Sequence, residues 1–203
     1  MPQMYKVFVK EVAIIVTSDK DLFPDHDAFN LKTVKFKKLA KAIKKGKVER
    51  PLLYSDNPDK LLKRLHKILP LVLAGGGLVE NELNQYLFIH RNGKWDLPKG
   101  KAENRESIEQ TSLREVEEET GVKNLVVKKY LGPTYHVFSR NGKMRLKLTH
   151  WYSMTTDYTG ELIPQEKEGI DQAVWLDARD ANDALESSYA NIRELFPERI
   201  PVK

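Results

Sequence analysis

Three glutamates, Glu115, Glu118 and Glu119, are spaced at i, i+3 and i+4 within one segment of the chain. A helix places residues at this spacing on one face, so the three carboxylates would lie together. Like charges at this spacing repel each other and cost an isolated helix roughly 0.2–0.5 kcal/mol per pair. A hard divalent cation with oxygen ligands would offset that repulsion. The alternative is an acidic helix face that is simply solvated.

Two features of the same segment favour the cation over the solvated face. Gly100 precedes the expected helix and Gly121 ends it directly after the acidic cluster, as a glycine at a helix C-terminus does. Ile108, Leu113 and Val116 form an apolar stripe on the opposite side, which would dock the helix on a core. The acidic face is therefore held in place between two backbone turns.

The pattern over residues 100–122 resembles the Nudix box, G-x5-E-x7-R-E-U-x-E-E-x-G-U with U apolar, and matches every fixed position. This resemblance implies an α/β/α sandwich with a mixed sheet over residues 71–203. It also implies Mg²⁺-dependent hydrolysis of a diphosphate linkage, typically in a nucleoside diphosphate joined to another group, with Mn²⁺ as an alternative metal. Residues 1–70 lie outside the resemblance and are expected to form a small α+β module.

The resemblance carries roles onto individual positions of this sequence. It implies that Glu115, Glu118 and Glu119 are metal ligands, and that Glu118 or Glu119 also orients the attacking water. Glu106 would support the metal cluster, and Arg114 would pair with a box glutamate and hold its conformation. Such an arrangement suits phosphoryl transfer, which needs charge neutralisation and alignment more than covalent chemistry.

The general base is not fixed by the box, because members of the family use either a box glutamate or a glutamate from a later loop. Residues 164–169, Pro-Gln-Glu-Lys-Glu-Gly, form such a loop and make Glu168 and Glu166 candidates. The alternative for both is a solvated loop carboxylate.

Lys99 stands directly before the box, in the segment Trp-Asp-Leu-Pro-Lys-Gly of residues 95–100. A lysine at this point resembles the branch of the family that hydrolyses diadenosine polyphosphates or diphosphoinositol polyphosphates. Its ammonium would add a point charge beside the metal site, which suits a substrate with several phosphates. A solvent-facing lysine is the alternative.

Further cations are candidates for phosphate binding. Arg145 and Lys147 alternate with Thr149 and Trp151 and would share one strand face, where two cations and an aromatic ring suit a polyphosphate attached to a ring. An edge strand protected by lysines would have the same pattern. Arg91 precedes a tight turn and either stabilises that turn or contacts phosphate.

The composition is that of a folded protein, with 40% hydrophobic and 31% charged residues among 203. The absence of cysteine excludes disulfides, cysteine-ligated metal sites and thiol catalysis. The sequence shows neither a membrane-length apolar run nor an apolar signal core, so we expect a cytoplasmic protein without membrane contact.

Charge is distributed unevenly along the chain. Residues 1–70 hold sixteen Lys or Arg against eight Asp or Glu, whereas the remaining residues hold eighteen against twenty-one. The basic module would either attract a polyanion, including RNA, or present a solvated face, and its few aromatic residues favour the solvated face. The sequence leaves a homodimer open.

Hydrophobic periodicity predicts the elements that position these residues. We expect a hairpin of strands at 5–9 and 12–16, a loop at 18–30, helices near 34–46 and 58–69, and a strand at 51–54. Further on we expect strands at 78–79, 86–89, 125–130, 135–139, 146–154 and 173–176, and helices at 107–120 and 184–196. The triplet Gly75-Gly76-Gly77 is expected in a strand with tightly packed surroundings.

The sequence therefore predicts an α+β protein in which a small N-terminal module precedes a Nudix hydrolase domain. The predicted substrate class is a dinucleoside or diphosphoinositol polyphosphate. The alternatives are an RNA 5′-end pyrophosphohydrolase and a Nudix-derived ligand-binding regulator. Loss of box glutamates would favour the regulator, and none is lost.

Overall fold

The computed structural model describes residues 3–196 and 198–201 of the chain. Their contacts divide the chain into two compact units. The first comprises the residues up to Val72 together with Tyr135–Lys147, and the second comprises Leu73–Thr134 and the residues from Leu148 onward. Strands β9 (Val126–Arg140) and β10 (Lys143–Thr156) are divided between the two units. Residues 135–140 of β9 and 143–147 of β10 belong to the first unit, and the rest of both strands belongs to the second. Among the described residues, each helix is too short or too polar to span a lipid bilayer.

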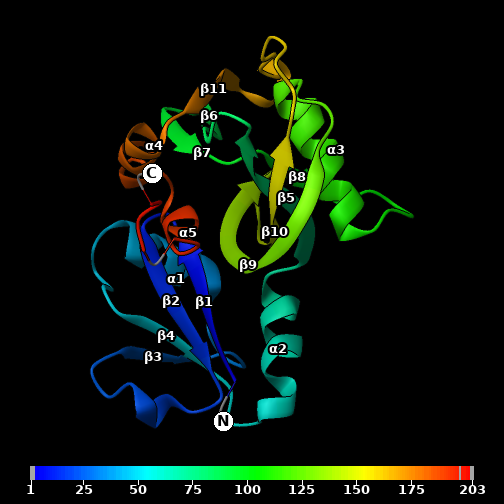
Figure 1. Ribbon diagram of the computed structural model, residues 1–203. Helices are drawn as coiled ribbons and strands as arrows, with labels where there is room; N and C mark the ends of the chain where they lie inside the picture. Colours follow the sequence, from blue (N-terminus) through cyan, green and yellow to red (C-terminus); the bar gives the residue numbers. More distant parts are fainter. Residues whose placement is uncertain (1–2, 197, 202–203) are drawn as a thin grey trace. The chain divides into compact units, whose positions relative to one another are not determined.

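The first unit is a small mixed sheet with two helices. Its strand order is β9-β1-β2-β4-β3, where β1 (Met4–Val9) and β2 (Val12–Thr17) form the expected antiparallel hairpin and β4 (Pro51–Tyr54) runs parallel to β2 (Figure 1). The edge strand β3 (Asp27–Asn30) lies in the segment expected to be a loop. Helices α1 (Phe36–Lys44) and α2 (Leu61–Ile68), the latter preceded by a 3-10 turn at Pro58–Lys60, bury their apolar faces in one core with the sheet.

The second unit is a sheet covered on both faces by helices. Its strand order is β11-β6-β5-β10-β9, built from β5 (Leu71–Asn81), β6 (Tyr86–Arg91), β9, β10 and β11 (Ile170–Leu176), with the short β7 (Lys94–Asp96) and β8 (Lys99–Lys101) alongside. Alternate residues of β6 separate into two cores. Phe88 packs with helices α4 (Ala178–Glu186) and α5 (Ala190–Arg193), whereas Leu87 packs with α3 (Ile108–Thr120). Because successive strand residues point to opposite faces, α3 and the α4–α5 pair cover different faces, as predicted for an α/β/α sandwich.

The glycine triplet explains how closely α3 approaches the sheet. A Cβ at Gly75 would lie 2.8 Å from the Ile108 carbonyl oxygen of α3, and a Cβ at Gly77 would lie 3.1 Å from Val116. Strand β5 therefore lets the helix backbone pack directly on it, and the expectation of tight surroundings for these glycines is confirmed. The close packing fixes the height of the acidic helix above the sheet.

Other expected elements also differ from the structure. The helix expected at 184–196 is two helices. The first, α4, begins earlier, at Ala178, and the preceding Asp177 caps it by accepting hydrogen bonds from the backbone N–H groups of Arg179 and Asp180. The chain then turns at Ser187 and Ser188 before α5. The strands expected at 125–130 and 135–139 are one continuous strand, β9.

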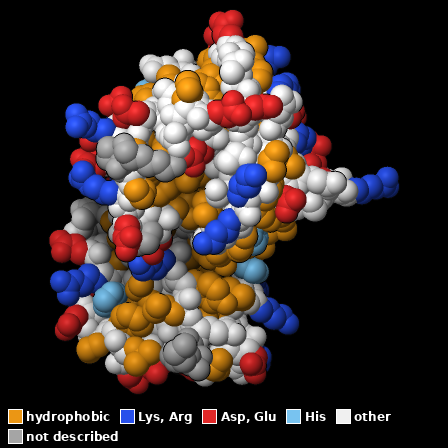
Figure 2. Space-filling view, viewed as in Figure 1, with side chains coloured by type: hydrophobic (Ala, Val, Ile, Leu, Met, Phe, Trp, Pro, Cys, Tyr) orange, Lys and Arg blue, Asp and Glu red, His pale blue; other side chains and the backbone are white. Residues whose placement is uncertain are grey.

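The lysines of the first unit do not produce a single basic surface on the face shown in Figure 2. Basic and acidic side chains alternate across that face, and neither kind gathers in one patch. A hollow of about 590 Å³ in the first unit is lined by Lys35 and Lys38 together with Phe29 and Tyr54. The rings of Phe29 and Tyr54 therefore lie close to lysines, although the sequence suggested few aromatic residues in this unit.

Candidate active site

Helix α3 is closed at both ends by its own sequence. At its start the Ser107 hydroxyl accepts from the Gln110 backbone N–H at 3.1 Å, and the Gln110 side chain accepts from the Ser107 backbone N–H at 2.8 Å. At its end Gly121 adopts a left-handed φ of 78°, which a glycine accepts without strain. The box residues between these two caps therefore have fixed helical positions.

Arg114 lies at the centre of a carboxylate cluster on this helix. Its guanidinium donates to both oxygens of Glu106, at 3.1 and 2.8 Å, to Glu115 at 2.8 Å and to Glu118 at 3.0 Å. This fork-shaped pairing, with smaller contributions from the Glu103 backbone and Thr111, lowers the pKa of Glu106 to about 2. Arg114 thus brings three of the predicted carboxylates to one point.

Glu119 is held separately and is almost fully buried, with 2% of its side chain exposed. Its Oε2 accepts a hydrogen bond of 2.8 Å from the Lys99 backbone N–H, and its Oε1 lies 3.5 Å from the Arg91 guanidinium. Burial raises the pKa of the Glu119 carboxyl to about 7, although the charges of Lys99 and Arg91 act in the opposite direction. The site therefore holds one buried carboxylate whose negative charge is only partly compensated.

Arg91 also connects Glu119 to the later loop. The second terminal nitrogen of its guanidinium lies 3.4 Å from Oε2 of Glu168, in the 3-10 turn Glu166–Glu168. The same loop is hydrogen bonded to the end of α3, where the backbone N–H of Gln165 donates to the Glu119 carbonyl at 3.1 Å. The structure thus brings Glu168 beside the box, while Glu166 is an exposed residue of the same turn.

Lys99 does not face solvent, which differs from the exposed position expected for a phosphate-binding lysine. Only 6% of its side chain is exposed, and its Nζ donates to Oδ2 of Asp96 at 2.6 Å. Asp96 is equally buried and was not singled out from the sequence. Its spacing of three residues from Lys99 across a proline turn was the available signal.

Arg145 and Lys147 belong to the other unit, in the hairpin end of β10. The Nζ of Lys147 lies 5.5 Å from the centre of the Phe138 ring. The expected binding face is wrong in its other two members, because Thr149 and Trp151 are fully buried. The Trp151 indole is part of the core beneath α4 and donates to Thr134 at 2.8 Å, so it offers no ring to a ligand.

The donor chemistry of the box fits a hard cation. Glu115, Glu118 and Glu119 offer oxygen ligands alone, the type that Mg²⁺ and other hard divalent ions prefer. In the described residues no three His, Cys, Asp or Glu side chains already form a metal cage, and three box carboxylates share Arg114 instead. The buried, partly compensated charge of Glu119 is the feature that a cation would neutralise.

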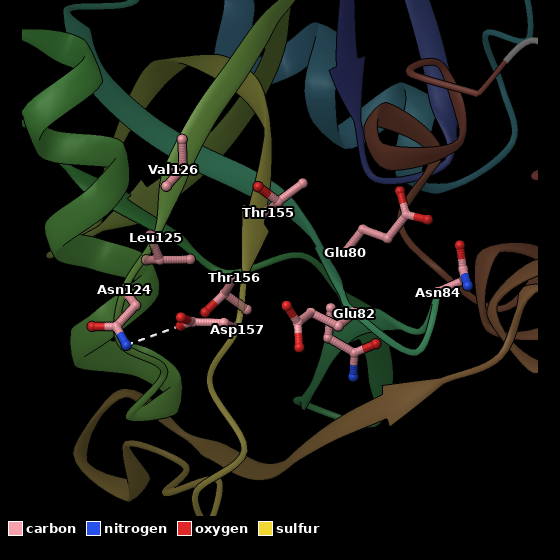
Figure 3. Close-up of a pocket in the computed structure, with 10 residues that line it drawn as sticks. Glu80, Glu82, Asn84, Asn124, Leu125, Val126, Thr155, Thr156 and Asp157 are labelled. Carbon is pink, nitrogen blue, oxygen red and sulfur yellow. Dashed lines mark hydrogen bonds between the residues drawn. The ribbon is translucent and has the colours of Figure 1, made fainter.

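A separate hollow lies elsewhere in the second unit. Its volume is about 690 Å³, and residues at the ends of β5, β9 and β10 line it, among them Glu80, Glu82, Val126 and Thr155 (Figure 3). Asn124 and Asp157 form a hydrogen bond of 2.9 Å on one side of it. None of the predicted site residues lines this hollow, so it is distinct from the box.

Comparison with known proteins finds a sequence relative of part of this chain. A Mycobacterium tuberculosis protein provisionally named mutator protein MutT4 is 36% identical over 109 residues, which are 53% of this chain and 42% of that protein. The chain thus spans less than half the length of this curated relative.

Solved structures with a similar fold include the MutT protein from Methanosarcina mazei Go1, with a TM-score of 0.51 and 23% identity over 63% of this chain and 91% of that chain. A C. elegans Ap4A hydrolase binary complex matches with a TM-score of 0.48 and 19% identity over 61% of this chain and 91% of that chain. The first of these likenesses shows the fold of the part of the chain that it covers.

A family model supplies the remaining finding. The NUDIX domain matches residues 70–198, which include the whole box, the later loop and the helices α4 and α5. Because this match spans well over half of the sequence, the chain belongs to the NUDIX domain family.

Proposed function

We propose that this protein is a Mg²⁺-dependent pyrophosphohydrolase that cleaves a phosphoanhydride bond. The observation that supports this best is the complete set of box carboxylates. Glu115, Glu118 and the buried Glu119 lie on helix α3, and Glu106, just before the helix, is paired with Arg114. Members of the Nudix family generally use a divalent metal, and Mn²⁺ is the alternative here.

Glu115, Glu118 and Glu119 would hold the metal, and Glu106 would support it through Arg114. A bound divalent ion neutralises phosphate charge and lowers the pKa of water. Arg114 would keep the carboxylates in place, because it contacts Glu106, Glu115 and Glu118 at the same time. Substrate and metal would thus meet carboxylates whose positions are already fixed.

The hydrolysis itself requires one proton transfer that a side chain of this protein can perform. A water oxygen forms a bond to phosphorus, the bridging oxygen leaves with the bonding electrons, and a carboxylate takes the proton of the water. We propose Glu168 for this role because Arg91 connects it to Glu119. Glu118 and Glu119 are the alternatives within the box.

For the substrate we propose a dinucleoside polyphosphate or a diphosphoinositol polyphosphate. This proposal rests on the segment of residues 95–100, which resembles that branch of the family. Arg91 is partly exposed, with 23% of its side chain accessible, and lies 3.5 Å from Glu119, so it would contact phosphate. Arg145 and Lys147 remain proposed substrate contacts.

A substrate panel tests both levels of the proposal. Diadenosine tetraphosphate, a diphosphoinositol polyphosphate, a nucleoside triphosphate and ADP-ribose would be compared by kcat/KM at one Mg²⁺ concentration. We expect the first two to be the better substrates. Equal efficiency on ADP-ribose would refute the substrate class and leave the hydrolase, whereas no Mg²⁺-dependent cleavage in a broad panel would refute the hydrolase.

A further inference from the structure

Lys99 and Asp96 form a buried ion pair directly beneath Glu119. Their side chains are 6% and 4% exposed, and Nζ and Oδ2 are 2.6 Å apart. Removing two ions from water carries a large desolvation cost, and apolar residues of similar size are often as stable in their place. Stability alone is therefore a weak reason for a pair at this position.

The pair closes the turn between β7 and β8. Asp96 is the last residue of β7 and Lys99 the first of β8, so the ion pair bridges Leu97 and Pro98. The second carboxylate oxygen of Asp96 accepts from the Leu97 backbone N–H at 2.9 Å. Both oxygens of Asp96 thus hold this turn.

The turn is also fixed against the sheet. The Pro98 carbonyl accepts from the Gly77 backbone N–H at 3.1 Å, and Lys99 is paired with Gly76 of β5. A Cβ at Gly76 would lie 2.6 Å from the Lys99 Cβ, so the lysine backbone has little room to move toward the sheet. The direction of the Lys99 N–H is therefore set by contacts on both sides.

We propose that the Asp96–Lys99 pair is a positioning device that aims the Lys99 backbone N–H at Oε2 of Glu119. The Lys99 ammonium thereby acts through the shape of the turn and not as a contact to substrate phosphate. This inference rests on the proposed function in one respect, the use of Glu119 as a metal ligand. Partners that orient a metal ligand in this way typically change metal affinity by about 10- to 100-fold when removed.

Binding of Mn²⁺ alone to the full chain tests this proposal without any substrate. Lys99→Met and Asp96→Asn remove opposite charges, so a purely electrostatic influence on the metal would change affinity in opposite directions. A positioning role predicts that both weaken Mn²⁺ binding, by about tenfold. Titration calorimetry, or the electron paramagnetic resonance signal of free Mn²⁺, measures the dissociation constants.

Two further variants complete the set. Asp96→Asn with Lys99→Met leaves no unpaired buried charge, so it decides the question where a single variant fails to fold. We expect it to weaken Mn²⁺ binding no more than either single change, because the pair acts as a unit. Lys123→Met removes the cation of an exposed ion pair with Glu117 and should leave the affinity unchanged.

Steady-state kinetics give an independent readout. Positioning predicts that Lys99→Met lowers kcat by the same factor on ADP-ribose and on diadenosine tetraphosphate, with little change in KM. The proposal is overturned if Lys99→Met tightens Mn²⁺ binding while Asp96→Asn weakens it, if neither changes it, or if KM rises with the number of phosphates. The Mn²⁺ affinities test the positioning proposal even if the protein cleaves no substrate. Failure of the positioning proposal can therefore be distinguished from failure of the proposed function.

Discussion

Gly100 and Glu115 are packed so closely that a Cβ at position 100 would overlap the Glu115 carboxylate. Gly100 lies in β8, paired with Gly75, and Glu115 lies on α3 above it. The first glycine of the box thus provides the space in which a proposed metal ligand stands.

We expect Gly100→Ala to abolish most of the hydrolase activity, because Glu115 must leave its contact with Arg114 to admit the methyl group. Activity and thermal unfolding would be measured together. Gly142→Ala is the matched control, since Gly142 lies in an open turn with a φ of 71° and no atom near its Cβ position. That control should cost about 1–2 kcal/mol of stability and leave kcat unchanged. Equal kcat in both variants would contradict the packing argument.

Glu118→Gln should lower kcat by two or more orders of magnitude while the protein stays folded. Glu118 is about half exposed, so its replacement disturbs no core, and metal-ligand contacts supply several kcal/mol of catalysis. Glu117→Gln changes the neighbouring exposed residue, which pairs with Lys123. It should retain activity. Near wild-type turnover in Glu118→Gln would exclude Glu118 from the metal site.

Glu119→Gln should stabilise the metal-free protein at high pH. Burial raises the pKa of Glu119 from 4.5 to about 7, so the carboxyl is neutral in both states below pH 4.5 and charged in both above pH 7. The folded wild-type protein therefore carries the full cost of a buried charge only above pH 7.

With a chelator present, the free energy of unfolding of Glu119→Gln relative to wild type should thus increase between pH 4.5 and pH 8, by about 3 kcal/mol. Urea denaturation at several pH values measures it. Added Mg²⁺ should reduce the difference by stabilising the wild type alone. If the difference in unfolding free energy between the two proteins does not change with pH, the charged Glu119 carboxylate does not destabilise the folded protein.

Arg91 and Glu168 should be coupled in catalysis. Glu168→Gln is expected to lower kcat with little effect on Mg²⁺ affinity, because the residue would act on the water. In an Arg91→Met background the same change should cost less, since Glu168 has already lost the contact that connects it to Glu119. A double-mutant cycle in kcat measures the coupling. Strictly additive effects on kcat would show that Glu168 does not act together with Arg91.

The lysines of α1 test whether the first unit attracts polyanions. Changing Lys37, Lys38, Lys41 and Lys44 to Gln should slow substrate capture at low salt if their field guides the substrate. Added salt should narrow the difference, because exposed charges are screened. Equal kcat/KM at low salt would identify these lysines as solvated surface.

The sequence predicted the box helix within one residue at its start, because the capping serine, the apolar stripe and Gly121 all agree on one element. It also predicted the packing of the glycine triplet. Strands β7 and β8 were missed, since three residues carry no periodicity and these strands exist only through pairing with β6 and β5.

The burial of Lys99 was not predictable either. A lysine is nearly always exposed, and the three-residue spacing of Asp96 from Lys99 becomes a buried ion pair only when the turn between β7 and β8 is formed. The contact between Arg91 and Glu168 joins residues seventy-seven positions apart, which no local pattern encodes. Local signals therefore identified the acidic helix, whereas long-range packing determined what surrounds it.

The path of the chain through β9 and β10 has a consequence for dissecting the protein. A fragment that begins at residue 71 keeps the segment Tyr135–Lys147 but lacks β1, the strand that pairs with Tyr135 and His136. Its hairpin would then end in an open edge, which invites intermolecular strand pairing. No single cleavage of the backbone yields the second unit in isolation, so deletion of the first seventy residues would confound loss of their own role with aggregation. Point substitutions are the sounder way to assign that role.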